Sequence, residues 1–305
     1  MGAIGDAIGD AIRTRRVEAN RLSFAVDEAG EGDTVALLLH GFPECRASWR
    51  GQLPALAKLG WRAVAPDLRG YGDTSRPRGR KAYRIDRLVD DVEALFEALG
   101  ARRRILIGHD WGGVLAWQVA LRGRAGLDGL IILNAPHPAV FRRAARTLEQ
   151  RLRSWYVLFF LLPVLPELHL TAARGARLAN ILKRASPGFS DALLQTLSRN
   201  IVRPGACTAM LDYYRENALP LISSAWPEPE PLPTPTLMIW GEKDVALSLQ
   251  LTEGNEAYVR DFTLRRLPGV SHWVQHEAPD QVNALIADWA RAKGLAGEGG
   301  APAVL

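Results

Sequence analysis

The sequence has few of the residues that cross-link secreted domains or hold metal ions. Its 305 residues include only two cysteines, Cys45 and Cys207. Two cysteines cannot form a disulfide framework, and they favour reduced, mostly buried thiols in a reducing compartment. Neither cysteine has a cysteine or histidine at the spacing of a metal site, so no bound metal is expected.

Long apolar stretches are also absent. The most apolar segment, residues 155–165, is too short to cross a bilayer and contains Pro163. Residues 1–12 lack the uninterrupted apolar core of a secretory signal, and Asp6 stands where a myristoylation site needs Ser or Thr. These absences predict a cytoplasmic protein with no transmembrane segment.

The remaining composition is that of a globular chain, with 48% hydrophobic and 23% charged residues. The net charge of +5 is unevenly placed: residues 137–231 hold 12 Lys and Arg against 7 Asp and Glu, whereas the rest of the chain balances at 26 of each sign. Such an excess attracts anionic ligands or membrane surfaces in some proteins and is a solvated helix face in others. We favour the solvated face and expect no nucleic-acid partner, because no aromatic residues interleave with the charges.

Short apolar runs alternate with helix-like segments along most of the chain. Runs with the length of a buried strand occupy residues 35–39, 63–65, 105–107, 130–133 and 236–240, and a further strand is expected at 262–267. Between them, segments such as 88–99 and 282–289 repeat apolar residues every three or four positions, as amphipathic helices do. This alternation predicts an α/β fold with a mostly parallel sheet flanked by helices.

One long segment interrupts the alternation. Residues 137–231 show helical patterns without a clear strand, which predicts a helical cap inserted into the α/β core. The core is then expected at residues 16–136 and 232–294, with a flexible extension at 1–15 and a flexible, Gly/Ala-rich tail at 295–305. Prolines at alternate positions from 227 to 235 predict a stiff linker that returns from the cap to the core.

An aspartate stands at the centre of a sharp turn between a strand and a helix. Residues 108–113 read Gly-His-Asp-Trp-Gly-Gly and follow an apolar run, which is the context of a nucleophile elbow. The glycines leave room for a strained turn that exposes the side chain of Asp110. A carboxylate there cannot perform serine-esterase chemistry, but it can displace a leaving group at saturated carbon and form an alkyl-enzyme ester.

Other predicted strands also end in polar residues, at positions 40–43, 240–244 and 269–273. The carboxyl ends of parallel strands are where α/β sheets place their sites. The chain order of nucleophile, acid and histidine predicts a triad of Asp110, Asp244 and His272. Here His272 acts as general base, and Asp244 orients and stabilises its imidazole.

Two further histidines, His40 and His109, lie beside these loops, but neither fits the position of the base. We expect both to be buried, hydrogen-bonded parts of the scaffold.

Taken in this order, the motifs resemble the epoxide-hydrolase branch of the α/β-hydrolase superfamily. The resemblance covers residues 17–291 and includes residues 67–75, which follow the pattern D-x-R-G-x-G-x-S/T. It also includes Ser-Trp-Tyr at 154–156 and Tyr-Tyr-Arg at 213–215 in the cap. The resemblance implies an α/β-hydrolase fold with a cap, and hydrolysis of an epoxide by water to a vicinal diol without a metal or an organic cofactor.

The resemblance also assigns an oxyanion hole to backbone amides. The amide of Trp111, directly after the nucleophile, would supply one donor, and the amide of Phe42 in the His-Gly-Phe-Pro loop would supply the other. The peptide bond between Phe42 and Pro43 is typically cis in this family.

Two cap tyrosines would hold the epoxide oxygen, and the matching positions are Tyr156 and Tyr214. Adjacent residues on a helix point about 100° apart, so only one of Tyr213 and Tyr214 can face the site. We choose Tyr214 because the family places its tyrosine directly before the arginine.

The substrate is predicted only by class. Leucine and phenylalanine are frequent at residues 159–162 of the cap, which favours an apolar epoxide in a closed pocket. The side chains expected to contact the substrate are Phe42, Pro43, Trp111, Phe159 and Trp273. The assembly is left open as a monomer or a homodimer.

Two alternatives accompany this interpretation. Haloalkane and haloacid dehalogenases use the same aspartate nucleophile, but they often carry Asn where this chain has Phe42, or Arg where it has Trp111. A non-catalytic, ligand-binding homologue would be expected to have a damaged triad, whereas every triad position is present here.

Overall fold

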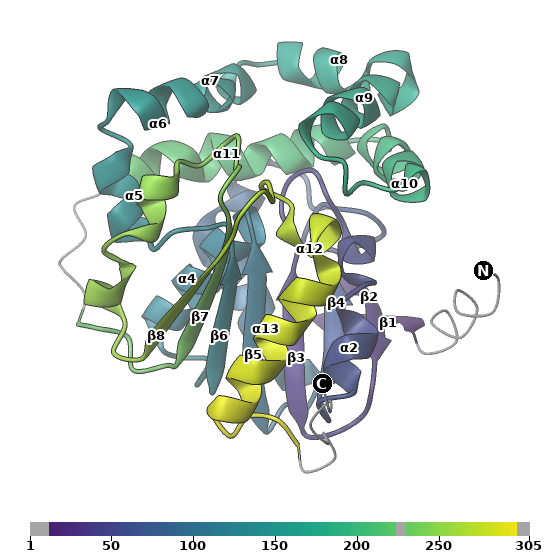
Figure 1. Ribbon diagram of the computed structural model, residues 1–305. Helices are drawn as coiled ribbons and strands as arrows, with labels where there is room; N and C mark the ends of the chain where they lie inside the picture. The colour runs from purple at the N-terminus through teal and green to yellow at the C-terminus, as the bar shows by residue number, and fades with distance from the viewer. Residues whose placement is uncertain (1–11, 224–229, 298–305) are drawn as a thin grey trace.

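The computed structural model describes residues 12–223 and 230–297, which form an eight-stranded sheet under a layer of helices (Figure 1). The strand order is β1-β2-β4-β3-β5-β6-β7-β8. The strands β2 and β1 are antiparallel to their neighbours, and all others pair in parallel, as the alternating pattern predicts. Their bounds are β1 (Arg13–Ala19), β2 (Leu22–Ala29), β3 (Thr34–Leu39), β4 (Arg62–Pro66), β5 (Arg103–His109), β6 (Gly129–Leu133), β7 (Thr236–Gly241) and β8 (Phe262–Leu267).

Each face of the sheet is covered by helices of the core. In the central strand β3, Leu37 and Leu39 pack into one apolar cluster and Ala36 and Leu38 into the other, because successive side chains of a strand point to opposite faces. The first cluster includes α3 (Ile85–Ala98) and α4 (Trp111–Arg122), and the second includes α2 (Leu53–Ala57), α12 (Val274–Glu277) and α13 (Pro279–Ala292). Short 3₁₀ turns in the core are η1 (Arg46–Trp49), η2 (Arg80–Tyr83), η4 (Leu249–Thr252) and η5 (Asn255–Tyr258).

The segment between β6 and β7 forms a helical cap over the carboxyl ends of the parallel strands (Figure 1). Its elements are α5 (Pro138–Ala144), α6 (Leu148–Arg153), α7 (Trp155–Leu161), α8 (Leu165–Thr171), η3 (Ala172–Gly175), α9 (Ala176–Ala185), α10 (Asp191–Ile201) and α11 (Ala206–Ser223). The long helix α11 lies between the sheet and the outer row made by α6, α7 and α8 (Figure 1). The cap therefore closes the edge of the sheet at which the predicted site residues emerge.

Both ends of the core reach beyond the predicted boundaries. Residues 13–15 belong to β1 and pair with β2, so this part of the expected extension is sheet. At the other end, Trp61 Nε1 donates to the carbonyl of Leu295 at 2.7 Å, and Gly297 N donates to the carbonyl of Leu59 at 2.8 Å. The expected flexible tail is thus held against the core at residues 295–297, while residues 1–11 and 298–305 lie outside the described part.

The return from the cap is anchored at its described end. Leu232 N donates to Tyr258 O at 2.8 Å, and Arg260 N donates to Leu232 O at 3.0 Å. The first two prolines of the predicted linker, at 227 and 229, lie outside the described residues.

Within the described ranges, no helix taken singly has the length and apolarity that a membrane span requires. The helices Trp155–Leu161 and Leu165–Ala185 meet that requirement only as a pair, and the chain bends by 109° between them.

Candidate active site

The turn after β5 places Asp110 at the edge of the sheet beneath the cap. Asp110 has a positive φ of 51° and a ψ of −121°, and α4 begins at the next residue. A side chain at Gly112 would place its Cβ 2.1 Å from the carbonyl oxygen of Leu39, so only glycine allows the turn to approach β3. The Asp110 side chain is 17% exposed and lines a cavity between core and cap.

The loop after β3 brings a backbone donor to this carboxylate. Phe42 N donates to Asp110 Oδ1 at 2.7 Å. The Phe42–Pro43 peptide bond is cis, as the family resemblance implies. A Cβ at Gly41 would lie 2.4 Å from the Asp110 carboxyl, so glycine is required for this close approach. The amide of Trp111 belongs to the first residue of α4, beside the same carboxylate.

The loops after β7 and β8 bring the other two triad residues to Asp110. His272 Nδ1 lies 2.6 Å from Asp244 Oδ2, and its Nε2 lies 3.6 Å from Asp110 Oδ2. Both His272 and Asp244 are buried. The imidazole is therefore held between two carboxylates, with Nδ1–H donating to Asp244 and Nε2 directed at Asp110.

This arrangement controls the protonation of His272. Burial alone disfavours the imidazolium, but Asp244 and Asp110 outweigh it and raise the pKa of His272 to about 10. Burial likewise disfavours the Asp244 carboxylate, yet His272 and Asn134 lower its pKa below the ordinary value. With this pKa, His272 is protonated at neutral pH. Any reaction that neutralises Asp110 removes part of this attraction and lowers the pKa of His272.

Asn134, which the sequence analysis missed, holds Asp244 in place. Its Nδ2 donates to Asp244 Oδ2 at 2.7 Å, and its Oδ1 accepts from Gly241 N at 3.0 Å. The amides of Ala246 and Leu247 donate to the other oxygen of Asp244 at 2.8 and 2.9 Å. Asn134 directly follows β6, so the rule that polar residues after parallel strands meet at one edge would have found it.

A second missed residue, Glu44, lies buried behind the triad. Its carboxylate is 2.9 Å from His109 Nδ1 and 2.6 Å from His276 Nε2. Burial opposes its charge, but these two imidazoles hold the pKa of Glu44 well below its usual range. The other nitrogen of His109 lies 3.0 Å from the backbone carbonyl of His272. Glu44 and His109 therefore brace the loop that carries His272.

The scaffold role predicted for His109 and His40 is confirmed by their contacts. Both are fully buried, and His40 Nε2 accepts from Leu68 N at 3.0 Å.

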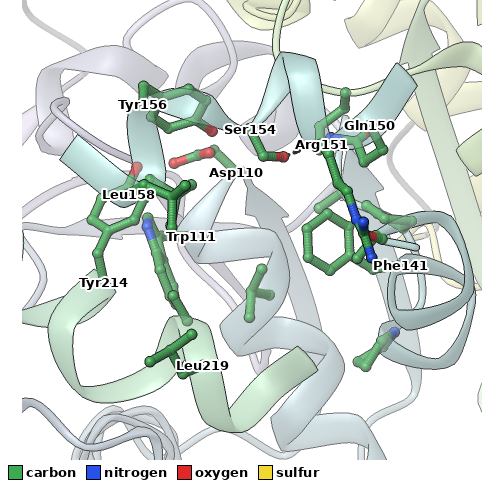
Figure 2. A pocket seen from close by; sticks show the side chains of 18 of the residues that line it. Asp110, Trp111, Phe141, Gln150, Arg151, Ser154, Tyr156, Leu158, Tyr214 and Leu219 are labelled. Carbon is green, nitrogen blue, oxygen red and sulfur yellow. Dashed lines mark hydrogen bonds between the residues drawn. The ribbon is translucent and has the colours of Figure 1, made fainter. Parts of the chain in front are cut away.

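The cap supplies two tyrosines opposite Asp110. Tyr156 on α7 and Tyr214 on α11 both line the cavity, with ring centroids 6.4 Å apart. Figure 2 shows both hydroxyls on the side of Asp110. Burial, with the charge of Asp110 added, raises the pKa of both phenols, so each remains a donor at neutral pH. Tyr213 points elsewhere, because its hydroxyl donates to Arg69 O at 2.9 Å.

The cavity has a volume of about 400 Å³ and lies between the core and the cap helices α5, α6, α7 and α11. Its apolar wall includes Val114, Phe141, Val157, Leu161, Leu219 and Leu247. Figure 2 shows Phe141 and Leu219 among the lining side chains. Of the five side chains expected to contact the substrate, only Trp111 lines this cavity. The other four are not among its lining residues. The ring of Phe42 lies against Phe160 and Tyr214 at 5.1 and 5.3 Å. Phe159 contacts His169 and Phe160, and Trp273 contacts Phe189 and His272.

The described ranges contain no cluster of three or more His, Cys, Asp or Glu side chains arranged to hold a metal ion.

Comparison with known proteins places this geometry in a family. A family model described as alpha/beta hydrolase fold matches residues 35–279. Human epoxide hydrolase 4 is 37% identical over 283 residues, covering 89% of this chain and 76% of the human protein. The AB hydrolase superfamily protein YfhM of Bacillus subtilis (strain 168) is 36% identical over 289 residues, covering 92% of this chain and 98% of that protein.

Solved structures agree with the sequence comparisons. The crystal structure of Bacillus megaterium epoxide hydrolase in complex with an inhibitor superposes with a TM-score of 0.83 at 29% identity, covering 91% of this chain and all of the other. The matches span most of the chain, including every strand from β3 to β8. The chain therefore belongs to the epoxide hydrolases of the α/β-hydrolase superfamily.

Proposed function

We propose that the protein hydrolyses an apolar epoxide to a vicinal diol through a covalent ester on Asp110. The observation that carries the proposal is the position of His272, whose two nitrogens lie 2.6 Å from Asp244 and 3.6 Å from Asp110. The two phenols on the opposite side of the cavity and the names of the relatives support it further. The apolar wall favours a substrate whose substituents are largely hydrocarbon.

In the first step, Asp110 attacks an epoxide carbon while Tyr156 and Tyr214 hold the ring oxygen. The carbon–oxygen bond of the ring breaks, an ester bond to Asp110 forms, and one phenol gives its proton to the departing oxygen. The product is a hydroxyalkyl ester. Because this ester is neutral, the pKa of His272 falls, and its proton restores the phenol through the solvent.

In the second step, neutral His272 removes a proton from water, and the hydroxide attacks the ester carbonyl. The amides of Phe42 and Trp111 hold the oxyanion that develops there. When the intermediate collapses, His272 gives its proton to the alcohol oxygen and the diol leaves. The carboxylic acid of Asp110 then protonates His272, which restores the resting ion pair.

The proposal is tested by assaying styrene, stilbene and fatty epoxides for diol, alongside haloalkanes and haloacetates for released halide. We expect diol from at least one epoxide and no halide. Halide release without epoxide turnover would instead favour a dehalogenase. Ligand binding without either product would favour a non-catalytic homologue.

Removal of either cap hydroxyl should slow ester formation. We expect Tyr156→Phe and Tyr214→Phe each to lower the single-turnover rate of ester formation by roughly 10²–10³-fold, the usual effect of losing one donor to a developing oxyanion. Tyr213→Phe is the matched control on the same helix. It loses a buried hydrogen bond, so its unfolding free energy should fall by about 1–3 kcal/mol while the ester forms at the normal rate. Equal rates in all three variants would contradict the role of the two phenols.

A further inference from the structure

The outer face of the cap carries a row of exposed apolar side chains. We call this row the cap ridge, and it consists of Leu148, Leu152, Trp155, Leu158, Leu162, Val164, Leu165 and Leu168. Leu148 is 73% exposed, Trp155 66% and Leu158 67%. The ridge runs along α6, α7 and α8, on the side of the molecule away from the sheet (Figure 1). Contiguous exposed apolar surface of this kind marks an interaction site.

The spacing of five of these residues places them on one face of α6 and α7. The positions 148, 152, 155, 158 and 162 recur every three or four residues, and backbone bonds through Ser154 link α6 to α7. The inward face of α7 is also apolar, since Val157 and Leu161 line the cavity and Phe160 is buried. A helix that is hydrophobic on all sides is normally buried in protein or lipid, yet Trp155 and Leu158 of α7 are exposed.

Charge identifies what can cover the ridge. Residues 137–185 contain nine Arg and Lys but only two acidic residues. Both acids are engaged, Glu149 with Arg153 at 3.2 Å and Glu167 with Arg215 at 2.7 Å. Arg146 and Arg151 are exposed just before and on α6, and the exposed Arg174 and Arg177 belong to η3 and α9, which contact α8.

A flat surface of anionic headgroups over an apolar interior complements this pattern, because basic and apolar groups are paired in the same way on interfacial helices. A second copy of the same face would instead bring arginine against arginine.

The length of α7 is also compatible with a position in the surface of a bilayer. At seven residues, α7 is about 10 Å long and can lie in the surface of a bilayer but cannot cross it.

We propose that the cap ridge docks on the surface of an anionic phospholipid bilayer. The Leu158 side chain belongs to the ridge and also lines the cavity, so the docked face is the outer side of the cavity wall. Docking places that wall against the phase in which an apolar substrate dissolves. Only this last consequence rests on the proposed function; membrane binding does not.

The test is sedimentation of the full chain with vesicles of phosphatidylcholine alone or with about one third phosphatidylglycerol. We expect binding to the anionic vesicles that weakens as salt is added, and little binding to the neutral ones. The ridge variant Leu152→Gln/Trp155→Gln/Leu168→Gln should bind at least tenfold more weakly. The matched control Val202→Gln/Leu249→Gln replaces exposed apolar residues outside the ridge and should bind normally. Circular dichroism melting verifies that each variant is folded.

A charge variant, Arg146→Glu/Arg174→Glu/Arg177→Glu, should also lose binding to anionic vesicles. The proposal is overturned if the native chain binds neither type of vesicle. It is also overturned if the ridge variant binds anionic vesicles as tightly as the native chain does. It is also overturned if the native chain is a dimer without lipid and the ridge variant is a monomer, because a second copy then covers the ridge. Diol formation is not measured in any of these experiments, so their failure is distinct from failure of the proposed function.

Discussion

Asp110→Asn should abolish diol formation, with a loss on the order of 10⁴-fold or more in kcat, because the amide is too weak a nucleophile to open the ring. The variant is close to isosteric, and its side-chain oxygen can still accept from Phe42 N. The fold should therefore survive, which a thermal melt would verify. Substrate binding should also survive, and equilibrium titration with the epoxide would measure it. Turnover within tenfold of the native rate would exclude Asp110 as the nucleophile.

In the native protein, hydrolysis of the Asp110 ester should leave an isotopic label. In a single turnover in heavy-oxygen water, the label should enter the Asp110 carboxylate, because water attacks the ester carbonyl rather than the epoxide carbon. Mass analysis of the peptide that contains Asp110 would detect it. An unlabelled carboxylate together with a labelled diol would mean that water opens the epoxide directly.

His272→Gln should separate the two steps. Ester formation needs Asp110 and the phenols, whereas ester hydrolysis needs a base, so the variant should accumulate the ester while kcat falls by roughly 10³–10⁴-fold. We expect a burst of one equivalent of consumed epoxide and a mass increase equal to the epoxide on the Asp110 peptide. His169→Gln, on α8 outside the cavity, is the control and should turn over normally without an adduct.

The pKa of His272 is expected to differ between the resting protein and the ester intermediate. In the resting protein the imidazole has a pKa of about 10, raised by Asp244 and Asp110 despite burial. In the proposed mechanism, alkylation of Asp110 removes its charge, so the pKa of His272 falls and the imidazole can act as base in the second step. A His272→Gln protein that turns over repeatedly without an adduct would show that a different group activates water.

The triad geometry could be anticipated from the sequence because each member follows a strand. Asp110, Asp244 and His272 come after β5, β7 and β8, and parallel strands bring their carboxyl ends together whatever lies between them. The choice of Tyr214 over Tyr213 came from the family resemblance, and the two side chains do point to different places.

The walls of the cavity could not be anticipated in the same way. Every residue of α7 is apolar or aromatic, so periodicity cannot tell which of them face inward. Phe159 was expected in the pocket but contacts His169 instead. The partners of Glu44 are 65 and 232 positions away, and no local pattern signals such a cluster.

Composition also failed to predict the order of the residues at the end of the described chain. Residues 294–297 are rich in Gly and Ala and were expected to be flexible, but backbone hydrogen bonds and the Trp61 indole hold them to the core. Bonds to main-chain atoms depend little on side-chain identity, so composition does not reveal them.

The division of the site between two parts of the chain separates the predicted triad from most of the cavity wall. All three triad residues belong to the core, whereas Tyr156, Tyr214 and most of the cavity wall belong to one continuous insertion. A single recombination event that exchanged this insertion would therefore change the substrate specificity and leave the three triad residues in place. The incoming stretch would need to bring only two suitably placed phenols.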